Sequence, residues 1–251
     1  MTNKKKLILS LVSVLLVFVL YSLFFGMQTA CVLGVRCFLR EPILDVVPES
    51  LVVNSFSPTN SSVEAFGYRF SVPWEKFSRQ EASSSSIVWW ANEDVGVSVY
   101  CLPPQEDVFG MILRANARKS EETVRMFTEE LNLSEVEAPN YYLTSKMLHT
   151  TPHDISIFDS ASEVMTASIL LVPKALGAYG GSSAMAMYSF DGAPMKGFQM
   201  GHPSVNRFVN LSLFDSFDRE IHLIVGIDPN ASVEVTQDDI NTLVFTFSSE
   251  L

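Results

Sequence analysis

The chain has 251 residues, with 28 acidic against 17 basic side chains and a formal net charge of −11. Apolar residues make up 47% and charged residues 18% of it, which excludes a disordered polyelectrolyte and a basic nucleic-acid-binding surface. Three cysteines are too few for a disulfide-built scaffold, and 12 glycines and 12 prolines exclude a collagen-like or low-complexity chain.

The amino-terminal residues predict a membrane-spanning helix. Residues 7–25 are apolar apart from three serines and one tyrosine, and no charge occurs between Lys6 and Arg36. Nineteen residues span about 28 Å as a helix, close to the thickness of bilayer hydrocarbon. A soluble helix of this length would carry a polar stripe, which is missing here. We therefore expect residues 7–26 to lie in the lipid bilayer, after a cytoplasmic head of residues 1–6.

The fate of this segment stays open between three alternatives. The run is longer than the apolar core of a usual signal peptide, which favours a retained anchor. Cys31 follows Ala30, as in a bacterial lipoprotein, but Gln28 stands where an aliphatic residue is expected. Conventional cleavage is the third alternative, although Gln28 is again a poor fit to a small-residue cleavage site.

The basic residues predict the orientation of the span. Lys4, Lys5 and Lys6 precede it, whereas Arg36 and Arg40 follow it. This asymmetry favours a single-pass cell-membrane protein with its amino terminus in the cytoplasm and its body outside. Without the three lysines the chain keeps 14 basic against 28 acidic residues, a charge of −14. Such a body repels nucleic acid, so we expect no nucleic-acid partner.

After the anchor we expect a linker at residues 27–62 and an extracytoplasmic α+β domain at residues 63–251. Residues 66–74 alternate between aromatic and polar side chains before a proline stop, which predicts a strand. Residues 87–90 and 95–101 predict a hairpin.

The remaining elements follow from periodicity and capping residues. The helices are predicted at 107–119, 120–131, 160–176 and 236–247, with a kink or break at Pro173. The strands are predicted at 184–190, 195–200, 207–214 and 220–227, with a hairpin loop at 215–218. The last helix carries a stripe predicted to be buried, Ile240, Leu243, Val244 and Phe247. The fold class is therefore α+β, an antiparallel β-sheet packed with helices.

The two ends of this domain carry a family resemblance. Residues 66–74 read Phe-Gly-Tyr-Arg-Phe-Ser-Val-Pro-Trp, and residues 243–247 read Leu-Val-Phe-Thr-Phe. They resemble the PsbP/DcrB-like α/β/α sandwich, whose members often begin with a Gly-Phe-Ser-Phe-x-x-Pro-x-x-Trp strand and end on a helix closing with Ser-Phe. Here Trp74 follows Pro73 directly, and the middle helical section is longer. The resemblance implies a non-enzymatic, often membrane-tethered module outside the cytoplasm, and it supplies no catalytic residues.

No motif in the chain predicts a catalytic or cofactor site. His149 and His153 form the best metal candidate, but Pro152 disrupts the helix that a zinc pair would need. His202 and His222 are interpreted as structural or solvent-facing. The serines of Gly180-Gly181-Ser182-Ser183 precede a strand, so they form neither a hydrolase elbow nor a phosphate loop. We therefore expect no metal and no cofactor.

The carboxylates are most simply interpreted as solvated faces of helices and loops. They include Glu121, Glu122, Glu129, Glu130, Asp238 and Asp239. Asp215 and Asp218 form a loop pair that would suit Ca²⁺, although the EF-hand pattern is missing.

Cysteines and large apolar residues leave further alternatives. Cys31 and Cys37 would pair in an oxidising compartment, while Cys101 is expected to be buried. Trp89 and Trp90 are adjacent on a strand and point to opposite faces, so one should enter the core and the other should cover an edge or an exposed patch. Four methionines, Met185, Met187, Met195 and Met200, fit either a sandwich core or a partner groove.

Two functions therefore remain open. The favoured one is a membrane-anchored, extracytoplasmic and non-catalytic binding or assembly module with an unknown ligand or protein partner. The alternative is an extracytoplasmic hydrolase whose site forms only in three dimensions.

Overall fold

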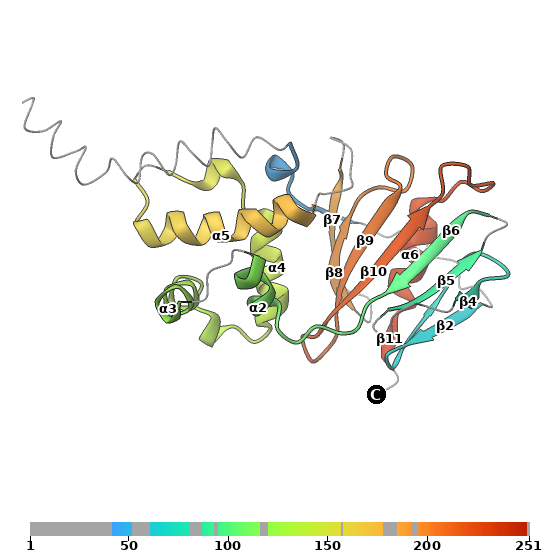
Figure 1. Ribbon diagram of the computed structural model, residues 1–251, viewed down its shortest axis with the longest axis horizontal. Helices are drawn as coiled ribbons and strands as arrows, with labels where there is room; N and C mark the ends of the chain where they lie inside the picture. The colour runs from blue at the N-terminus through green and yellow to red at the C-terminus, as the bar shows by residue number, and fades with distance from the viewer. Residues whose placement is uncertain are drawn as a thin grey trace, which may run out of the picture.

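A computed structural model describes residues 42–51, 61–80, 87–92, 95–115, 120–156, 158–177, 185–191 and 195–249. These residues form two sheets of mostly antiparallel strands and five α-helices, so the predicted α+β class is confirmed (Figure 1). The expected bilayer segment, residues 7–26, lies outside this part of the chain. Among the described helices, none has the length and apolar character needed to span a bilayer.

The larger sheet has eight strands. Their spatial order is β1 (Glu49–Ser50), β7 (Met187–Phe190), β8 (Lys196–Met200), β9 (Phe208–Phe214), β10 (Glu220–Ile227), β6 (Val97–Cys101), β5 (Val88–Asn92) and β4 (Ser78–Gln80). All neighbours are antiparallel except β1 and β7. Alternating residues of β6, β9 and β10 are buried on one face, as the period of two predicts.

A second layer covers that buried face. It contains the small sheet of β2 (Ser62–Ala65), β3 (Tyr68–Ser71) and β11 (Ser248–Ser249), together with α6 (Gln237–Phe245). Thr236 and Asp239 form a capping box at the start of α6, as the sequence predicts. The predicted stripe on α6 is buried, although Phe247 lies beyond the last helical residue.

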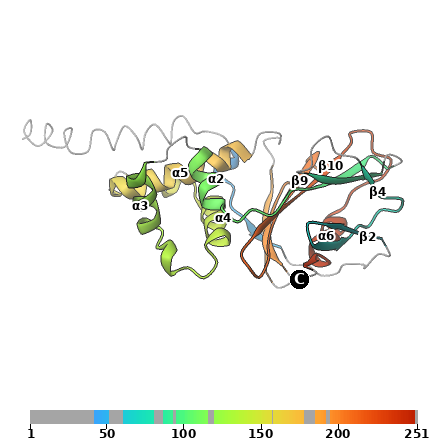
Figure 2. The same ribbon diagram turned by 60° about the horizontal axis from the view of Figure 1, so that its bottom comes forward.

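The remaining helices form a separate group at the β7–β8 side of the sheet (Figures 1 and 2). They are α2 (Val108–Ala115), α3 (Glu121–Glu130), α4 (Pro139–His149) and α5 (Ala161–Gly177). Three 3-10 turns connect and support them, η1 (Pro42–Asp45), η2 (Leu133–Glu135) and η3 (Pro152–Asp154). The helices share one core with each other and a second core with Phe198 and Phe214 of the sheet.

Part of the segment expected as a linker packs on the body. Leu44 of η1 is fully buried against the helical group, and β1 pairs with β7. Residues 42–51 therefore belong to the folded part of the chain.

The strand predicted at residues 66–74 is shorter than expected. Phe66 and Gly67, with φ of 53° and 82°, form the turn between β2 and β3, and β3 begins only at Tyr68. Positive φ at both central residues is the geometry of a two-residue hairpin turn. Aromatic alternation alone did not reveal this turn.

Two further differences concern helices. The sequence does not predict α4, because Ala138 precedes it without a side-chain cap. Instead, the carboxylate of Asp218 accepts hydrogen bonds from the backbone N–H groups of Asn140 at 2.6 Å and Tyr141 at 3.0 Å. The second difference is that α5 is not broken at Pro173 but continues to Gly177.

The two groups of elements leave part of the larger sheet uncovered. No described helix or strand lies on the second face of β4, β5, β6 and the adjoining part of β10, whereas α6 and the small sheet lie on the first face (Figure 2). This uncovered face carries the candidate site.

Candidate functional site

A trough crosses the uncovered face because small residues from three neighbouring strands stand in one row. Ala91 of β5 lies opposite Ser98 of β6, and Ser98 lies opposite Gly226 of β10. Phe208 of β9 follows in the same row and closes it with a ring that is 49% exposed. Since strands are spaced about 4.8 Å apart, the row of small residues is about 10 Å long.

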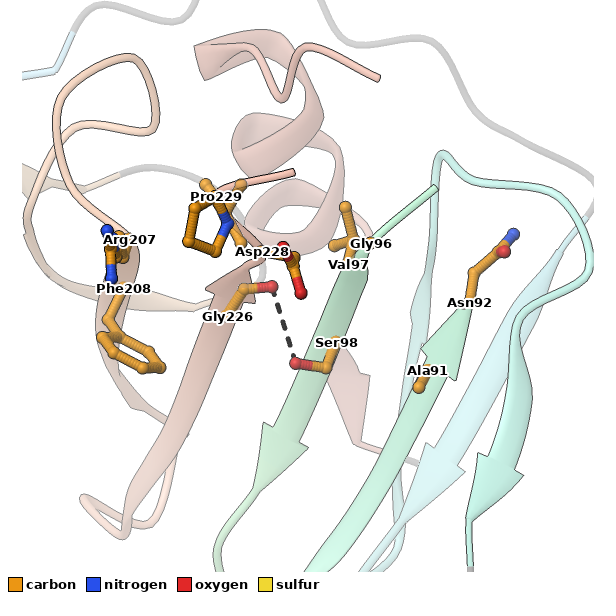
Figure 3. Close-up of a pocket in the computed structure, with 11 residues that line it drawn as sticks. Ala91, Asn92, Gly96, Val97, Ser98, Arg207, Phe208, Gly226, Asp228 and Pro229 are labelled. Carbon is orange, nitrogen blue, oxygen red and sulfur yellow. Dashed lines mark hydrogen bonds between the residues drawn. The ribbon is translucent and has the colours of Figure 1, made fainter. Parts of the chain in front are cut away.

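Gly226 allows the close packing that forms the floor of the trough. A Cβ atom at this position would lie 2.7 Å from Ser98 Oγ, 3.5 Å from the Phe208 ring and 3.6 Å from the Tyr100 ring. Ser98 Oγ donates a long hydrogen bond of 3.5 Å to the Gly226 carbonyl (Figure 3). A larger residue at 226 would displace these groups.

Two further aromatic residues lie beside the trough on the same face of the sheet. Trp89 and Tyr100 stand opposite each other on β5 and β6, and their rings stack with centroids 5.3 Å apart and planes 14° apart. Trp90 lies on the other face in the main core and is only 4% exposed. The prediction that the two tryptophans point to opposite faces is therefore confirmed.

Polar groups stand at the end of the trough, whose volume is about 460 Å³ (Figure 3). Arg207 is exposed, and its guanidinium has no hydrogen bond or ion pair within the described part of the chain. The exposed Asp228 accepts a hydrogen bond from the Asn230 N–H at 2.7 Å through Oδ1. Its own N–H donates to the Gly96 carbonyl at 2.8 Å, which joins two turns into an end wall.

A second group of functional side chains lies further along the same face. Ser212 and His222 are directly opposite each other on β9 and β10, and Ser212 Oγ is 3.4 Å from His222 Nδ1. His222 Nε2 is 3.4 Å from an oxygen of Glu220, which is 2% exposed. Burial lowers the pKa of His222, but the hydrogen bond and charge of Glu220 outweigh it, so the pKa is raised.

This arrangement predicts a measurable pH dependence. The raised pKa means that the Glu220–His222 pair stabilises the fold below the ordinary histidine pKa of about 6.5. That contribution is lost as the pH rises through the folded-state pKa. We expect Glu220→Gln to lower the pKa of His222 measured by NMR titration, because the negative charge of Glu220 then no longer opposes the lowering effect of burial.

His202 is the matched control for this substitution, because it lies in a turn where its Nδ1 contacts Ser204 Oγ at 2.7 Å and not Glu220. The NMR signals of its ring at a fixed pH should be the same in Glu220→Gln as in the unmodified chain. An unchanged pKa for His222 in that variant would show that Glu220 is not its electrostatic partner.

The other predicted metal candidates remain apart. His149 is exposed at the end of α4, with Nδ1 2.8 Å from the Ser145 carbonyl oxygen. His153 lies in η3, 3.5 Å from Asp45. No cluster of three or more histidine, cysteine or acidic side chains suited to a metal ion occurs within the described residues.

Asp215 and Asp218 are both engaged by donors of the protein itself. Asp215 accepts hydrogen bonds from the Tyr68 hydroxyl at 2.7 Å and from Arg219 Nε at 2.8 Å, besides two backbone N–H groups. Burial raises the pKa of Asp215, but these hydrogen bonds outweigh it and hold the pKa below its usual value. Asp218 caps α4 through the N–H groups of Asn140 and Tyr141. The loop that carries both aspartates therefore connects the helical group to the sheet.

The remaining candidates are structural. The acidic residues Glu121 and Glu122 occupy the first turn of α3, and Asp238 and Asp239 occupy that of α6. Burial raises the pKa of the Cys101 thiol to about 12, so it is not a nucleophile at neutral pH.

The four methionines do not form a shared groove. Met185, Met187 and Met200 pack with the helical group, whereas Met195 packs in the main core. Cys31, Cys37 and residues 180–183 lie outside the described residues.

The trough was missed by sequence reasoning because its residues come from three separate segments of the chain. Only the small residues Ala91, Ser98 and Gly226 in otherwise large-residue strands hinted at it. Comparisons with family models, curated proteins and solved structures give no match for this chain.

Proposed function

We propose that this chain is a single-pass membrane protein whose body is a non-catalytic binding module outside the cytoplasm. The observation that carries the proposal is the trough, an open hollow of about 460 Å³ lined by the half-exposed ring of Phe208, on a sheet face that no described element covers. A concave surface with aromatic walls and a few polar groups is typical of a ligand site.

The membrane part of the proposal rests on the sequence. Residues 7–26 suit a bilayer span, and Lys4, Lys5 and Lys6 favour a cytoplasmic amino terminus. A relation to the PsbP/DcrB-like sandwich belongs to the same proposal. It is supported by helices on both sides of the larger sheet, α6 on one and α4 with α5 on part of the other.

Cysteine labelling in intact cells tests location and binding together. Cys31 and Cys37 are changed to serine, and Cys101 can stay because it is fully buried. Ser98→Cys then places a thiol in the trough, and Ser134→Cys places a matched exposed thiol on η2. A membrane-impermeant maleimide should label both variants without cell lysis.

Occupancy of the trough should slow the labelling of Ser98→Cys in cells several-fold relative to the purified protein. The Ser134→Cys rate should be the same in both settings. Labelling that requires lysis would contradict the topology, and equal relative rates at both positions would contradict binding in the trough.

A hydrolase remains the second candidate because Ser212, His222 and Glu220 lie in hydrogen-bonding order. The low exposure of Ser212 opposes it, because a nucleophile must be within reach of a substrate and Ser212 is only 8% exposed. A serine-reactive fluorophosphonate tests this candidate: labelling of the purified chain that is lost in Ser212→Ala would favour the hydrolase.

A further inference from the structure

The geometry of the trough points to a ligand class: we propose that it binds a sugar residue that carries a carboxylate. This inference rests on the proposed binding function and specifies its ligand. It uses the row of small residues, the rings of Phe208 and Tyr100, and the charge of Arg207.

The position of the trough argues against an extended peptide. Peptides that bind sheets usually add a strand at an exposed edge, where main-chain groups are unpaired. The trough crosses β5, β6 and β10, and the ladder pairs each with its neighbours: β5 with β4 and β6, and β10 with β6 and β9. A peptide lying there would find few free main-chain donors or acceptors.

The walls also argue against two other classes. A lipid tail or an apolar drug-like molecule is usually enclosed by apolar side chains, whereas Ser98, Arg207 and Asp228 contribute polar groups to this open hollow. A nucleic acid is disfavoured because the chain beyond Lys6 has 14 basic against 28 acidic residues.

A pyranose ring combines the two kinds of surface that the trough presents. One face of such a ring exposes C–H groups, which pack on aromatic side chains, and its edge carries hydroxyl groups. The rings of Phe208 and Tyr100 lie beside Gly226, and Phe208 is half exposed, so its ring offers these C–H groups an accessible surface. The Ser98 hydroxyl and the second oxygen of Asp228 can bond hydroxyl groups at the edge of the sugar.

Arg207 supplies the preference for an acid. Its guanidinium is exposed and has no partner among the described residues, in a chain with a net charge of −11. A carboxylate on the sugar ring would form a bidentate, charge-assisted pair with it. Neutral sugars lack this interaction and should bind more weakly.

The test uses the full chain purified in a detergent without a sugar headgroup. The probes are a galacturonic acid trimer, 3′-sialyllactose and a disaccharide containing N-acetylmuramic acid, each with its neutral reduced analogue. Binding is measured by calorimetry and by saturation-transfer NMR. We expect at least one acidic probe to bind about 10-fold more tightly than its analogue.

Matched variants locate the site. Arg207→Gln should remove the preference for the acid, whereas Arg125→Gln makes the same charge change on α3 and should leave it intact. Ser98→Leu and Ala91→Leu fill the trough at two separate positions and should abolish binding, with thermal unfolding of each variant as the check on folding.

Three results would overturn the proposal. They are equal affinity for acidic and neutral probes, no binding of any acidic probe, and binding that survives both filling variants. A further outcome is that an aromatic tripeptide binds, that no sugar probe binds, and that Ser98→Leu abolishes the binding of the peptide. This outcome would overturn the ligand class but leave the trough as a binding site. The proposed function and its ligand class can therefore fail separately.

Discussion

Replacing Lys174 by methionine is expected to destabilise the body by roughly 3 kcal/mol, because two buried carbonyl groups and one half-buried carbonyl group would lose their donor, at a cost of about 1–3 kcal/mol for a buried group. Lys174 is 1% exposed, and its Nζ donates to the carbonyl oxygens of Leu148 at 2.8 Å, Thr150 at 2.9 Å and Leu44 at 3.1 Å. These carbonyls belong to η1, to α4 and to the residue that follows α4.

The charge of Lys174 fits this role. Burial lowers the pKa of Lys174 to about 8, and the nearby Asp154 and Asp45 oppose the shift. At neutral pH the amine is therefore mostly protonated and has three N–H donors, one for each carbonyl. Methionine has a similar length but no donor.

Thermal unfolding of the purified chain measures the effect. The melting temperature should fall by roughly 6–12 °C in Lys174→Met, since 1 kcal/mol corresponds to about 2–4 °C in a domain of this size. The control is Lys146→Met, which removes an exposed lysine of α4 and should change the melting temperature little. Equal melting temperatures for the two variants would show that the three carbonyls do not depend on Lys174.

Phe247→Ala is expected to cost roughly 3–5 kcal/mol of unfolding free energy, the usual range for a buried phenylalanine. Phe247 is fully buried between the second layer and the larger sheet. Its ring stacks on Tyr68 and on Phe70 of β3, with ring centroids 5.3 Å apart in both pairs. Its removal would leave a cavity beside both rings.

Chemical denaturation compares this variant with Phe158→Ala. Phe158 is 87% exposed, so the same substitution there should change the unfolding free energy by less than about 0.5 kcal/mol. Similar effects at the two positions would mean that Phe247 does not contribute to the core as the packing indicates.

The sequence by itself determined the elements whose signals are local. The period-two pattern of residues 220–227 is sufficient for β10, because Ile221, Leu223 and Val225 are buried on one face of that strand. At the start of α3, the side chain of Ser120 accepts a hydrogen bond from an N–H group three residues away. At the start of α6, the side chains of Thr236 and Asp239 each accept one from the backbone N–H group of the other. Such signals are complete within one segment, so the class of the fold followed from them.

Only the tertiary structure decided the elements that depend on distant residues. The cap of α4 comes from Asp218, 78 residues beyond Asn140, and no pattern within residues 139–149 announces it. Lys174 likewise bonds a carbonyl 130 residues away at Leu44.

The trough depends on register in the same way. Ala91, Ser98 and Gly226 form one row only because β5, β6 and β10 pair with a particular alignment, and a shift by one residue would turn each side chain to the opposite face. Periodicity in the sequence fixes which residues of a strand share a face. The alignment between strands is set by the packing of the whole core, and with it the place where a ligand can bind.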